Sequence, residues 1–512
     1  MAMGETEARA RARGGIRNRI YIIGAGSTGS AIASEIQRKG VLGSVVAFLD
    51  DDPEKIGRRI LGLPVLGPIA EVVDLLRQTP ADEAIIAMPR CTAAQIHRVY
   101  QLLRGAGFSR IRIVPGIAQV LEDEPHLVQA REIDPEDLLS RSPVAVNLRE
   151  TLSYVRGRRV LVTGAGGSIG SELSRQLLSG GPERLYLFGH GESSISEVER
   201  ELALLQHEGV GEAVSVVPVI GELQDRDFMR FIMSRVRADV VFHAAAHKHV
   251  PLMEANPVEA VKNNVYGTQN IVDACREAGV SRFVLISTDK AVEPVCVYGA
   301  SKLIAEEIVL HEAAVAAQRD DVDDRGQFLV VRFGNVLGSS GSFMPLFRKQ
   351  ILTGGPVTVT HPEARRYLMT IPEAVSLVLK AGGSGIGGQL YLLDMGEPKL
   401  IREVAEEMIR FYGFEPHRDI EIAYTELRPG DKLVESLWGA GDITELTESE
   451  KVLRVSRAYS MNGDLAKLMD RLRPVCYLDA DHGTAYRNRN VLKAVLHEAI
   501  PSIASVDGEP DY

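Results

Sequence analysis

Two glycine-rich loops, each directly after a short apolar run, constrain the fold of this chain more than any other feature. The first loop, Gly24 to Gly29, follows the run 19–23, and the second, Gly164 to Gly170, follows the run 159–163. A strand, a glycine turn and a helix in this order form the nucleotide-binding unit of a Rossmann fold, because the glycines let the backbone approach a phosphate at the helix N terminus. We therefore predict an α/β protein with two Rossmann-type domains, each built on a doubly wound parallel sheet.

The second loop opens a longer series of strands than the first. Apolar runs alternate with helical patterns, as a doubly wound sheet requires, and these runs lie at 184–188, 214–219, 239–243, 282–286 and 328–332. The predicted organisation is a disordered tail (1–18), an N-terminal Rossmann-like nucleotide-binding domain (19–118), an acidic, turn-prone linker (119–157), a catalytic domain (158–472) with a smaller substrate lobe at about 339–380 and 395–440, and a C-terminal tail (473–512).

Composition excludes several classes of protein. The net charge of −11 argues against general binding to nucleic acid or to an anionic membrane. No run of about 18 apolar residues occurs, so we expect no membrane span, and the segment 5–19 has no apolar stretch typical of a secretory signal. The four cysteines are scattered without metal-ligand spacing, which predicts no metal site and a reducing, cytoplasmic location.

Polar residues with catalytic potential follow the apolar run 282–286. Catalytic groups in open α/β sheets lie just past the carboxyl ends of such strands, and here the candidates are Thr288, Asp289, Lys290, Tyr298 and Lys302. Tyr298 and Lys302 are four positions apart, so on a helix they share one face, and an ammonium group beside a phenol lowers the pKa of the phenol. The alternatives are ordinary surface polar residues and, for Asp289 and Lys290, a solvated ion pair.

The second glycine loop predicts a nicotinamide cofactor. Its glycines fall at 164, 167 and 170, the spacing used by short-chain dehydrogenase-type folds. We predict NAD rather than NADP, because Glu192 offers a carboxylate for the ribose hydroxyls and no arginine stands nearby to hold a 2′-phosphate. The predicted cofactor contacts are Gly164, Gly167, Ser168, Ile169, Gly170, Glu192, Glu222, Leu223, Ala244, Tyr298 and Lys302.

The first glycine loop predicts a second nucleotide site. Gly24, Gly26 and Gly29 would approach the phosphate, and Asp50 is the acid that ends the following strand. A nucleotide or a nucleotide-sugar fits this pattern. The alternative is a Rossmann-like domain used for assembly or sensing.

Six stretches of the chain together resemble one protein family. They are 162–170, 246–254, 286–292, 332–338, 366–370 and 427–432. From about Ile20 to Leu437 the chain resembles the CapD-like polysaccharide-biosynthesis proteins, which are UDP-N-acetylglucosamine 4,6-dehydratases of the extended short-chain dehydrogenase/reductase class. It departs from them in several places. Long members begin with membrane helices and many carry Met at the position of Tyr298, and this chain has Gly189 and Asp431 where Asp and Glu are usual.

The resemblance implies a mechanism. Tyr298 would take the proton of the C4 hydroxyl as hydride leaves C4, Lys302 would hold the ribose, and Thr288 would bond the C4 oxygen. Asp289 would then protonate the leaving C6 oxygen while Lys290 acts at C5. These last two roles need an acid and a base on one loop, so we expect the pKa values of both groups to be displaced toward neutrality.

The same resemblance implies a UDP-sugar substrate, which five residues are expected to contact. Arginine forks match phosphate oxygens, so Arg366 and Arg428 are the predicted contacts to the diphosphate. Lys248, His249 and Asn335 each follow a predicted strand and are the other predicted substrate contacts. For His249 and Asn335 a purely structural role is the alternative. By analogy we also expect a homo-oligomer. Two other functions stay open, namely a C4 epimerase of the same fold and a non-catalytic nucleotide sensor.

Overall fold

A computed structural model divides the chain into two units, Met1–Ala145 and Val146–Tyr512. The structure describes residues 18–39, 42–89, 91–108, 110–114, 131–133, 148–318, 326–449, 451–458, 461, 464–478 and 484–503. The predicted tail 1–18 therefore lies almost wholly outside the described residues, as does most of the predicted linker. Each unit contains its own sheet and is described by itself below.

The first unit is built on a seven-stranded sheet in the order β3-β4-β2-β1-β5-β6-β7. Strands β4, β2, β1, β5 and β6 run parallel, and the short edge strands β3 and β7 are antiparallel. The strands are β1 (Arg19–Ile23), β2 (Ser44–Leu49), β3 (Arg59–Ile60), β4 (Leu63–Leu66), β5 (Glu83–Ile86), β6 (Arg110–Ile113) and β7 (Arg131–Glu132). The helices are α2 (Ser27–Lys39), η1 (Ile69–Glu71), α3 (Val72–Gln78) and α4 (Ala93–Gly105).

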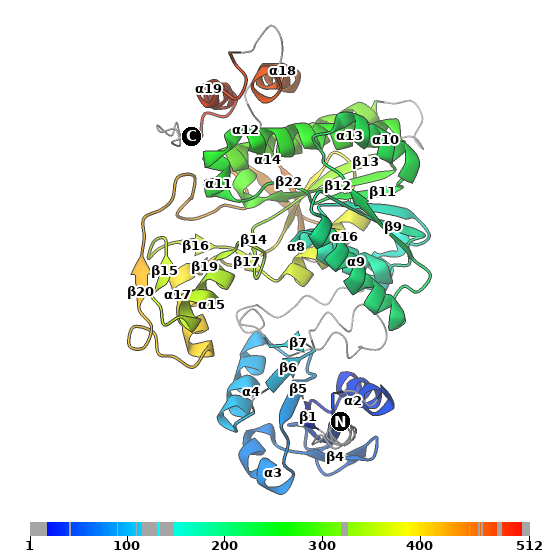
Figure 1. Cartoon of the computed structure of the whole chain (residues 1–512), viewed down its shortest axis with the longest axis vertical. Helices are drawn as coiled ribbons and strands as arrows, with labels where there is room; N and C mark the ends of the chain where they lie inside the picture. Colours follow the sequence, from blue (N-terminus) through cyan, green and yellow to red (C-terminus); the bar gives the residue numbers. More distant parts are fainter. Residues whose placement is uncertain are drawn as a thin grey trace, which may run out of the picture. The chain divides into compact units, whose positions relative to one another are not determined.

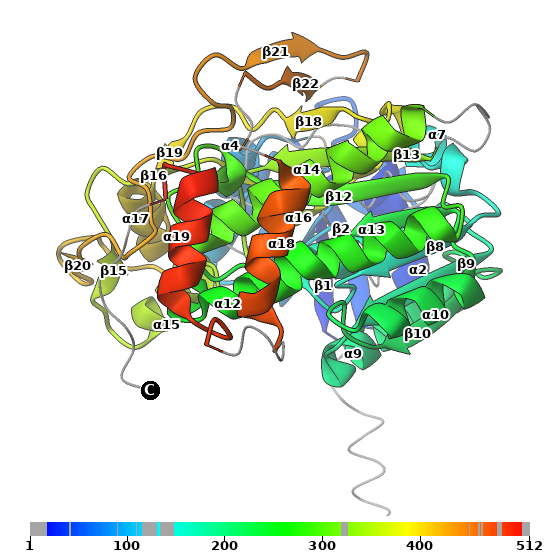
Figure 2. The ribbon, with the colours of Figure 1, turned by 90° about the horizontal axis from the view of Figure 1, so that it is seen from above.

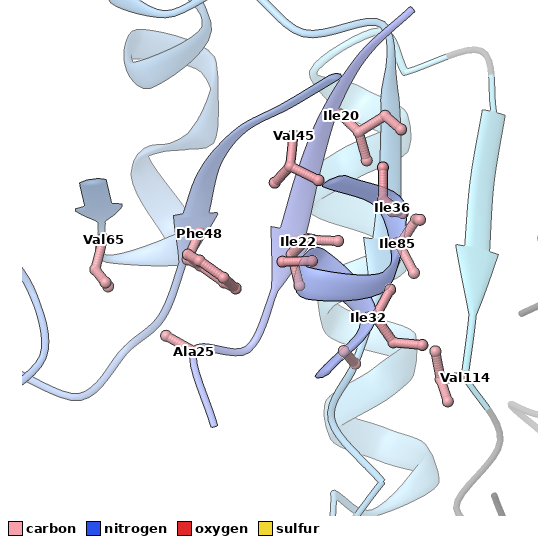
Figure 3. Packing of buried hydrophobic residues seen from close by; sticks show 12 residues of the cluster. Ile20, Ile22, Ala25, Ile32, Ile36, Val45, Phe48, Val65, Ile85 and Val114 are labelled. Atoms are coloured by element: carbon pink, nitrogen blue, oxygen red, sulfur yellow. The ribbon is translucent and has the colours of Figure 1, made fainter. Parts of the chain in front are cut away.

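The core of this unit explains why α2 follows the first glycine loop. Ile32 and Ile36 are one turn apart on α2 and fully buried, and they face Ile22 on β1 and Ile85 on β5 (Figure 3). The strands carry near-continuous apolar residues, as expected for a parallel sheet covered on both faces. The helix is thereby held with its N terminus at the carboxyl end of β1.

The second unit contains a nine-stranded sheet in the order β10-β9-β8-β11-β12-β13-β18-β22-β21. Seven strands from β10 to β18 run parallel, and β22 and β21 add antiparallel. The strands are β8 (Arg159–Thr163), β9 (Arg184–Gly189), β10 (Ser215–Ile220), β11 (Val240–His243), β12 (Arg282–Thr288), β13 (Gln327–Phe333), β18 (Leu390–Leu393), β21 (Ile443–Leu446) and β22 (Val452–Ser456). The strand order reverses between β8 and β11, and ligands of such folds bind at this switch point.

Helices cover both faces of this sheet (Figures 1 and 2). One face carries α10 (Arg226–Val236), α13 (Gly267–Glu277) and α14 (Val297–Ala317), and the other carries α8 (Ser168–Ser179), α9 (Glu192–His207) and α16 (Ile371–Ser384). Both units thus have the predicted Rossmann-type α/β architecture.

A smaller lobe lies beside the carboxyl ends of the strands (Figure 1). Three two-stranded sheets build it, namely β14 (Asn335–Val336) with β17 (Leu368–Met369), β15 (Val357–Val359) with β20 (Ile422–Tyr424), and β16 (Arg365–Arg366) with β19 (Lys399–Leu400). Helices α15 (Phe343–Leu352) and α17 (Ile401–Phe411) complete it. The lobe draws on two stretches that are separated in sequence by α16 and β18.

The structure corrects two predicted boundaries of the catalytic domain. Residue 472 lies inside α18 (Leu465–Cys476), which packs with α19 (Arg489–Ala499) against α12 (Pro257–Val261) and α14 (Figure 2). At the other end, α7 (Leu148–Thr151) and η3 (Ser153–Val155) fall in the predicted linker, but buried Leu152 and Val155 and a 3.1 Å hydrogen bond from the Tyr154 hydroxyl to the Leu379 carbonyl join them to the second unit. Apolar burial therefore extends the unit at both ends. No helix in the described ranges is both long and apolar enough to cross a membrane.

Candidate active site

The predicted catalytic residues Thr288, Asp289 and Lys290 lie where β12 ends, and this segment is called the catalytic loop below. The Thr288 hydroxyl donates to Asp289 Oδ1 over 2.9 Å and accepts from the Lys290 amide, which starts the short helix η5 (Asp289–Ala291). The Asp289 side chain is fully buried, and its Oδ2 has no hydrogen-bond partner in the described part of the chain. An acid with one unpaired, desolvated oxygen is suited to donate a proton to a bound molecule.

Lys290 lies among three acceptors. Its Nζ is 3.0 Å from Asp289 Oδ1, 3.2 Å from Asn335 Oδ1 and 3.6 Å from Glu435 Oε1. Burial lowers the pKa of Lys290, but the Asp289 and Glu435 carboxylates outweigh burial and raise it above its usual value. The expected displacement of this pKa toward neutrality is therefore wrong for this arrangement, because Glu435 adds a second carboxylate from a distant part of the chain.

Tyr298 stands on the first turn of α14. The Cys296 Sγ accepts from the Gly299 amide at 3.3 Å and so caps this helix, and the Glu254 carboxylate accepts from the Val297 amide at 2.6 Å. Tyr298 is buried, which raises its pKa to about 12 even though nearby Lys290 and a hydrogen bond with Thr288 act to lower it. The side chains on the catalytic loop and on α14 are thus joined into one group.

Lys302 lies one turn further along α14. Its Nζ donates to the Ile286 carbonyl at 2.7 Å, and burial lowers its pKa to about 8. The expected acidification of Tyr298 by Lys302 is not what this structure has, because the opposing cation is Lys290 and burial of the phenol outweighs it. Both lysines nonetheless lie within the same buried site.

A buried ion pair lies beneath the catalytic loop and was missed by the sequence reasoning. Arg332 on β13 donates to both oxygens of Glu306 on α14, at 3.1 and 2.7 Å, and both side chains are almost fully buried. The Ser287 hydroxyl donates to the same carboxylate at 2.5 Å. Glu306 is one helical turn from Lys302, which was the available signal, and it links β12, β13 and α14 at the site.

Buried His243 at the end of β11 connects β8, the strand before the second glycine loop, to α13. His243 Nδ1 lies 2.7 Å from the Thr163 hydroxyl, and its Nε2 lies 3.1 Å from the Thr268 hydroxyl, which itself donates to the Asn264 carbonyl. Nε2 is therefore the donor and Nδ1 the acceptor of a neutral imidazole. Burial lowers the pKa of His243 to about 3.

The second glycine loop is shaped to let a backbone approach a ligand. A Cβ on Gly170 would lie 2.1 Å from the Gly164 carbonyl oxygen, so only glycine permits α8 to begin this close to β8. Gly167 precedes α8 and no side chain caps that helix. A Cβ on Gly167 would lie 3.2 Å from the same Gly164 carbonyl oxygen, so this position is also tight. A helix N terminus that no side chain caps suits a phosphate group, so the residues present fit a dinucleotide.

The other predicted cofactor residues surround this loop. Ser168 accepts from the Ser340 amide at 3.1 Å, and the Ala244 amide donates to the Thr163 carbonyl at the end of β8. Glu192 begins α9 and is exposed, and Glu222 and Leu223 follow β10, with Leu223 buried. The loops after β8, β9, β10 and β11 thus bring these residues to one end of the sheet; Ile169 lies with them on the first turn of α8.

The predicted substrate residues fall into two groups. Asn335 contacts Lys290, and Lys248 and His249 follow β11, where the His249 ring packs on Gly341 so closely that a Cβ there would clash. The two arginines bond their own lobe instead. Arg366 donates to the carbonyls of Arg365, Leu433 and Lys432 at 2.7 to 3.0 Å, and exposed Arg428 pairs with Asp431 at 2.8 Å.

Asp50, the acid predicted to serve the first glycine loop, already has hydrogen-bond partners within the protein. Asp50 Oδ2 accepts from the Ala25 amide at 2.7 Å and from Lys55 Nζ at 3.2 Å. Burial raises the pKa of Asp50, but these hydrogen bonds outweigh it and the pKa is lowered. Gly24 has φ +104°, and a Cβ on Gly29 would lie 2.0 Å from the Gly24 carbonyl, whereas Gly26 is open. The Asp50 carboxylate therefore braces this loop.

No group of histidine, cysteine and acidic side chains in the described ranges is arranged to hold a metal ion. All four cysteines are free thiols.

Comparison with known proteins identifies the family of the second unit. A family model described as "polysaccharide biosynthesis protein" matches residues 160–457, which is more than half of the chain. The chain belongs to this family. Residues 2–115 match a model described as "CoA-binding domain". The family match includes both the second glycine loop and the catalytic loop, and it ends before α18.

Individual relatives agree with this assignment. The probable polysaccharide biosynthesis protein EpsC of Bacillus subtilis is 41% identical over 454 residues, which is 88% of this chain and 73% of that protein. A UDP-N-acetylglucosamine 4,6-dehydratase (inverting) of Campylobacter jejuni is 32% identical over 246 residues, 48% of this chain and 69% of that protein. Proteins named UDP-glucose 4-epimerase, for example in Rickettsia canadensis, also match.

A solved structure supports the fold of the second unit. The X-ray structure of Pen from Bacillus thuringiensis is 28% identical and matches with a TM-score of 0.52, covering 60% of this chain and 92% of that one. The polysaccharide-biosynthesis family assignment therefore has support from both sequence and fold.

Proposed function

We propose that the chain catalyses the NAD-dependent 4,6-dehydration of a UDP-N-acetylhexosamine, probed first with UDP-N-acetylglucosamine, to the 4-keto-6-deoxy sugar nucleotide. The observation that carries the proposal is the contact between buried Asp289 and part-buried Lys290, with atoms 3.0 Å apart, in one group with Tyr298. Dehydration needs an acid and a base at neighbouring carbons of the sugar, and this loop supplies both. The dehydratases among the relatives support the same reaction class.

The glycine loop would hold the cofactor, with Gly164, Gly167 and Gly170 at the diphosphate and Glu192 at a ribose. NAD, when bound there, supplies the hydride acceptor for C4 and the hydride donor for C6. Tyr298 takes the C4 hydroxyl proton as a phenolate, the form that Lys290 and the hydrogen bond with Thr288 favour against the effect of burial. Thr288 orients the C4 oxygen through its hydroxyl. Lys302, one turn further along α14, would hold the ribose of the cofactor from its place beside the Ile286 carbonyl.

Asp289 and Lys290 can exchange their roles by moving one proton. Along their 3.0 Å contact, a carboxylate and an ammonium become a carboxylic acid and an amine with no change in total charge. In the second form Lys290 takes the C5 proton and Asp289 gives its proton to the C6 oxygen. The C6–O bond then breaks, water leaves, and the pair returns to its ionic form.

Proteins named UDP-glucose 4-epimerase are also among the relatives, so a C4 epimerase is the second candidate. It would use Tyr298 and Lys302 but would have no need of the Asp289–Lys290 pair. A non-catalytic nucleotide sensor would need neither pair. The buried, unpaired oxygen of Asp289 favours the dehydratase, because burying it without a function costs free energy.

The test is incubation of the purified protein with UDP-N-acetylglucosamine and mass analysis of the sugar nucleotide. Loss of one water is expected. A C4 epimer of unchanged mass would identify the epimerase instead, and an unchanged substrate with bound cofactor would identify the sensor.

A substitution sharpens this test. Lys290→Ala should lower the rate of water loss by roughly 100- to 10,000-fold, because a positioned base contributes about that much. Tyr298 remains in this variant, so substrate should still produce the absorbance of bound NADH. Water loss at the wild-type rate would contradict the role of Lys290 as the base.

A further inference from the structure

Glu435 is a buried carboxylate that the substrate lobe brings into the catalytic site. It is 4% exposed, and its Oε1 lies 3.6 Å from Lys290 Nζ. Its other oxygen, Oε2, is buried and has no hydrogen-bond partner in the described part of the chain. A carboxylate in this state is costly unless the site uses its charge.

The backbone around Glu435 is fixed on both sides. Upstream, the Arg366 guanidinium donates to the carbonyls of Lys432 and Leu433 at 2.8 and 3.0 Å, and Lys432 Nζ donates to the Val292 carbonyl at 2.7 Å. Downstream, Leu437 is buried. The carboxylate is therefore held in place beside the catalytic loop by bonds that reach both β16 and the segment after η5.

Lys290 has one positive charge and lies beside two buried carboxylates, so the group of three carries a net negative charge when all are ionised. Its ammonium group meets two buried carboxylates, Asp289 at 3.0 Å and Glu435 at 3.6 Å, with Asn335 as the neutral third acceptor. If Asp289 gives up its negative charge by taking a proton, Glu435 remains as a counter-charge. The site therefore keeps a carboxylate beside Lys290 throughout the proposed proton transfers.

We propose that Glu435 is a positioning residue for the elimination step, holding the Lys290 amino group toward C5 and stabilising the ammonium that forms there. The inference rests on the proposed dehydratase function. In the step, the C5 proton passes to Lys290 Nζ and the electron pair of the C5–H bond becomes the C5–C6 double bond. The C6–O bond breaks, the oxygen takes the Asp289 proton, and water leaves.

This role predicts a pH signature. The titratable and charged groups that face Lys290 come from its own loop, from α14 and the segment before it, from the segment after β11 and from the lobe; they are Asp289, Tyr298, Cys296, Lys248 and Glu435. The two carboxylates raise the pKa of Lys290 against the effect of burial. Removing the charge of Glu435 therefore lowers this pKa and makes Lys290 a weaker base, present as free amine at lower pH.

The experiment compares Glu435→Gln, Glu435→Asp and the wild type as full chains. Glu435→Gln should slow water loss by roughly 10- to 100-fold, equivalent to one or two pKa units of base strength. The proposed pair needs its one shared proton, so the rate falls at high pH where Lys290 loses that proton. In Glu435→Gln this fall should move to lower pH, because the pKa of Lys290 is lowered. Substrate should still produce bound NADH, because Tyr298 and Lys302 are untouched, and Glu435→Asp should recover much of the rate because it keeps the charge.

Glu312→Gln is the matched control. Glu312 is also buried and pairs with Arg276 on the outer side of α14, at 2.9 Å. It should leave the pH profile and the rate of water loss unchanged. Melting temperature and cofactor content are measured for every variant, so that loss of folding is separated from loss of elimination.

Three results would overturn the inference. The first is that Glu435→Gln has the rate and the pH profile of the wild type. The second is that a folded Glu435→Asp loses NADH formation and water loss equally, while its pH profile does not move. If the wild type itself releases no water from any UDP-N-acetylhexosamine, the proposed function fails and the inference falls with it. That last outcome is seen before any variant is made.

Discussion

At the residue scale, burial decides how the polar groups of the second unit behave. His243, Tyr298 and Lys302 are each displaced from their usual pKa in the direction that favours the neutral form. Lys290 is displaced the other way, because two carboxylates surround it. Four neighbouring side chains thus differ in charge preference because of their immediate partners.

His243 gives a prediction for stability against pH. Its pKa is about 3 in the folded chain and about 6.5 when unfolded. The unfolded state therefore binds more protons below pH 6.5, so the stabilisation is complete above that pH and is lost as pH falls toward 3. Between pH 7.5 and 5 this one group should cost the second unit about 2 kcal/mol.

Chemical denaturation at the two pH values measures the loss. His243→Gln removes the titrating group and should remove that part of the pH dependence, although it also lowers stability at pH 7.5. An unchanged slope against pH in this variant would show that other groups cause the acid sensitivity.

At the scale of single elements, α14 organises the site. It carries Tyr298 and Lys302 on consecutive turns and Glu306 on the next. Through Glu306 it is joined to β13 by Arg332 and to β12 by Ser287. The position of the catalytic loop relative to α14 therefore depends on a buried ion pair below it.

Breaking this ion pair should be expensive. Arg332→Met leaves the Glu306 carboxylate with less compensation in a buried place, and we expect a loss of about 3 to 5 kcal/mol. The control is Arg230→Met, which breaks an exposed pair with Glu277 and should cost about 1 kcal/mol or less. Similar losses for the two variants in urea denaturation would show that the buried pair has no special weight.

The turn between β8 and α8 gives a second prediction at this scale. A methyl group at position 170 would meet the Gly164 carbonyl at 2.1 Å, so Gly170→Ala must push α8 away from β8. Bound dinucleotide, measured in the purified protein, should fall at least about tenfold, since each 1.4 kcal/mol of lost affinity is a factor of ten. Gly105→Ala in the first unit is the control, because that position is open. Equal cofactor content in both variants would show that the turn tolerates the change.

At the scale of the whole molecule, each unit contains its own complete sheet. All the proposed catalytic residues lie in the second unit. That unit extends beyond the family match to include α18 and α19. Arg489 at the start of α19 donates to the Glu254 carbonyl, and Glu254 in turn accepts from the amide that begins α14. The last helices are therefore part of the fold that holds Tyr298.

Leu472 tests whether these helices melt with the unit. It is fully buried on α18, and Leu472→Ala should destabilise the second unit by about 2 to 5 kcal/mol. Val491→Ala on half-exposed α19 surface is the control and should change little. Calorimetry should show a lower melting temperature for the whole second unit. A separate early transition that leaves the main one in place would mean that α18 and α19 unfold on their own.

The sequence was sufficient for the strands from β8 to β13 and for the two glycine turns, because apolar runs and glycines act locally. It did not predict β18, β21 and β22. It was insufficient wherever partners come from distant positions. Glu435 reaches Lys290 only through the fold of the lobe, and the Ser287–Glu306–Arg332 contacts join three elements. The boundary at 472 failed for a similar reason, since the apolar residues of α18 have their partners on α12 and α14 rather than in their own neighbourhood.

The antiparallel end of the large sheet has a consequence for synthesis. Strand β18 ends at Leu393, but β22, which covers its outer edge, begins only at Val452. At typical translation speeds the ribosome needs roughly 3 to 12 s to make the residues between them. Throughout that interval the nascent chain carries an open, apolar strand edge able to pair with another chain. Expression at lower temperature or with added chaperone should therefore improve the yield of correctly assembled protein.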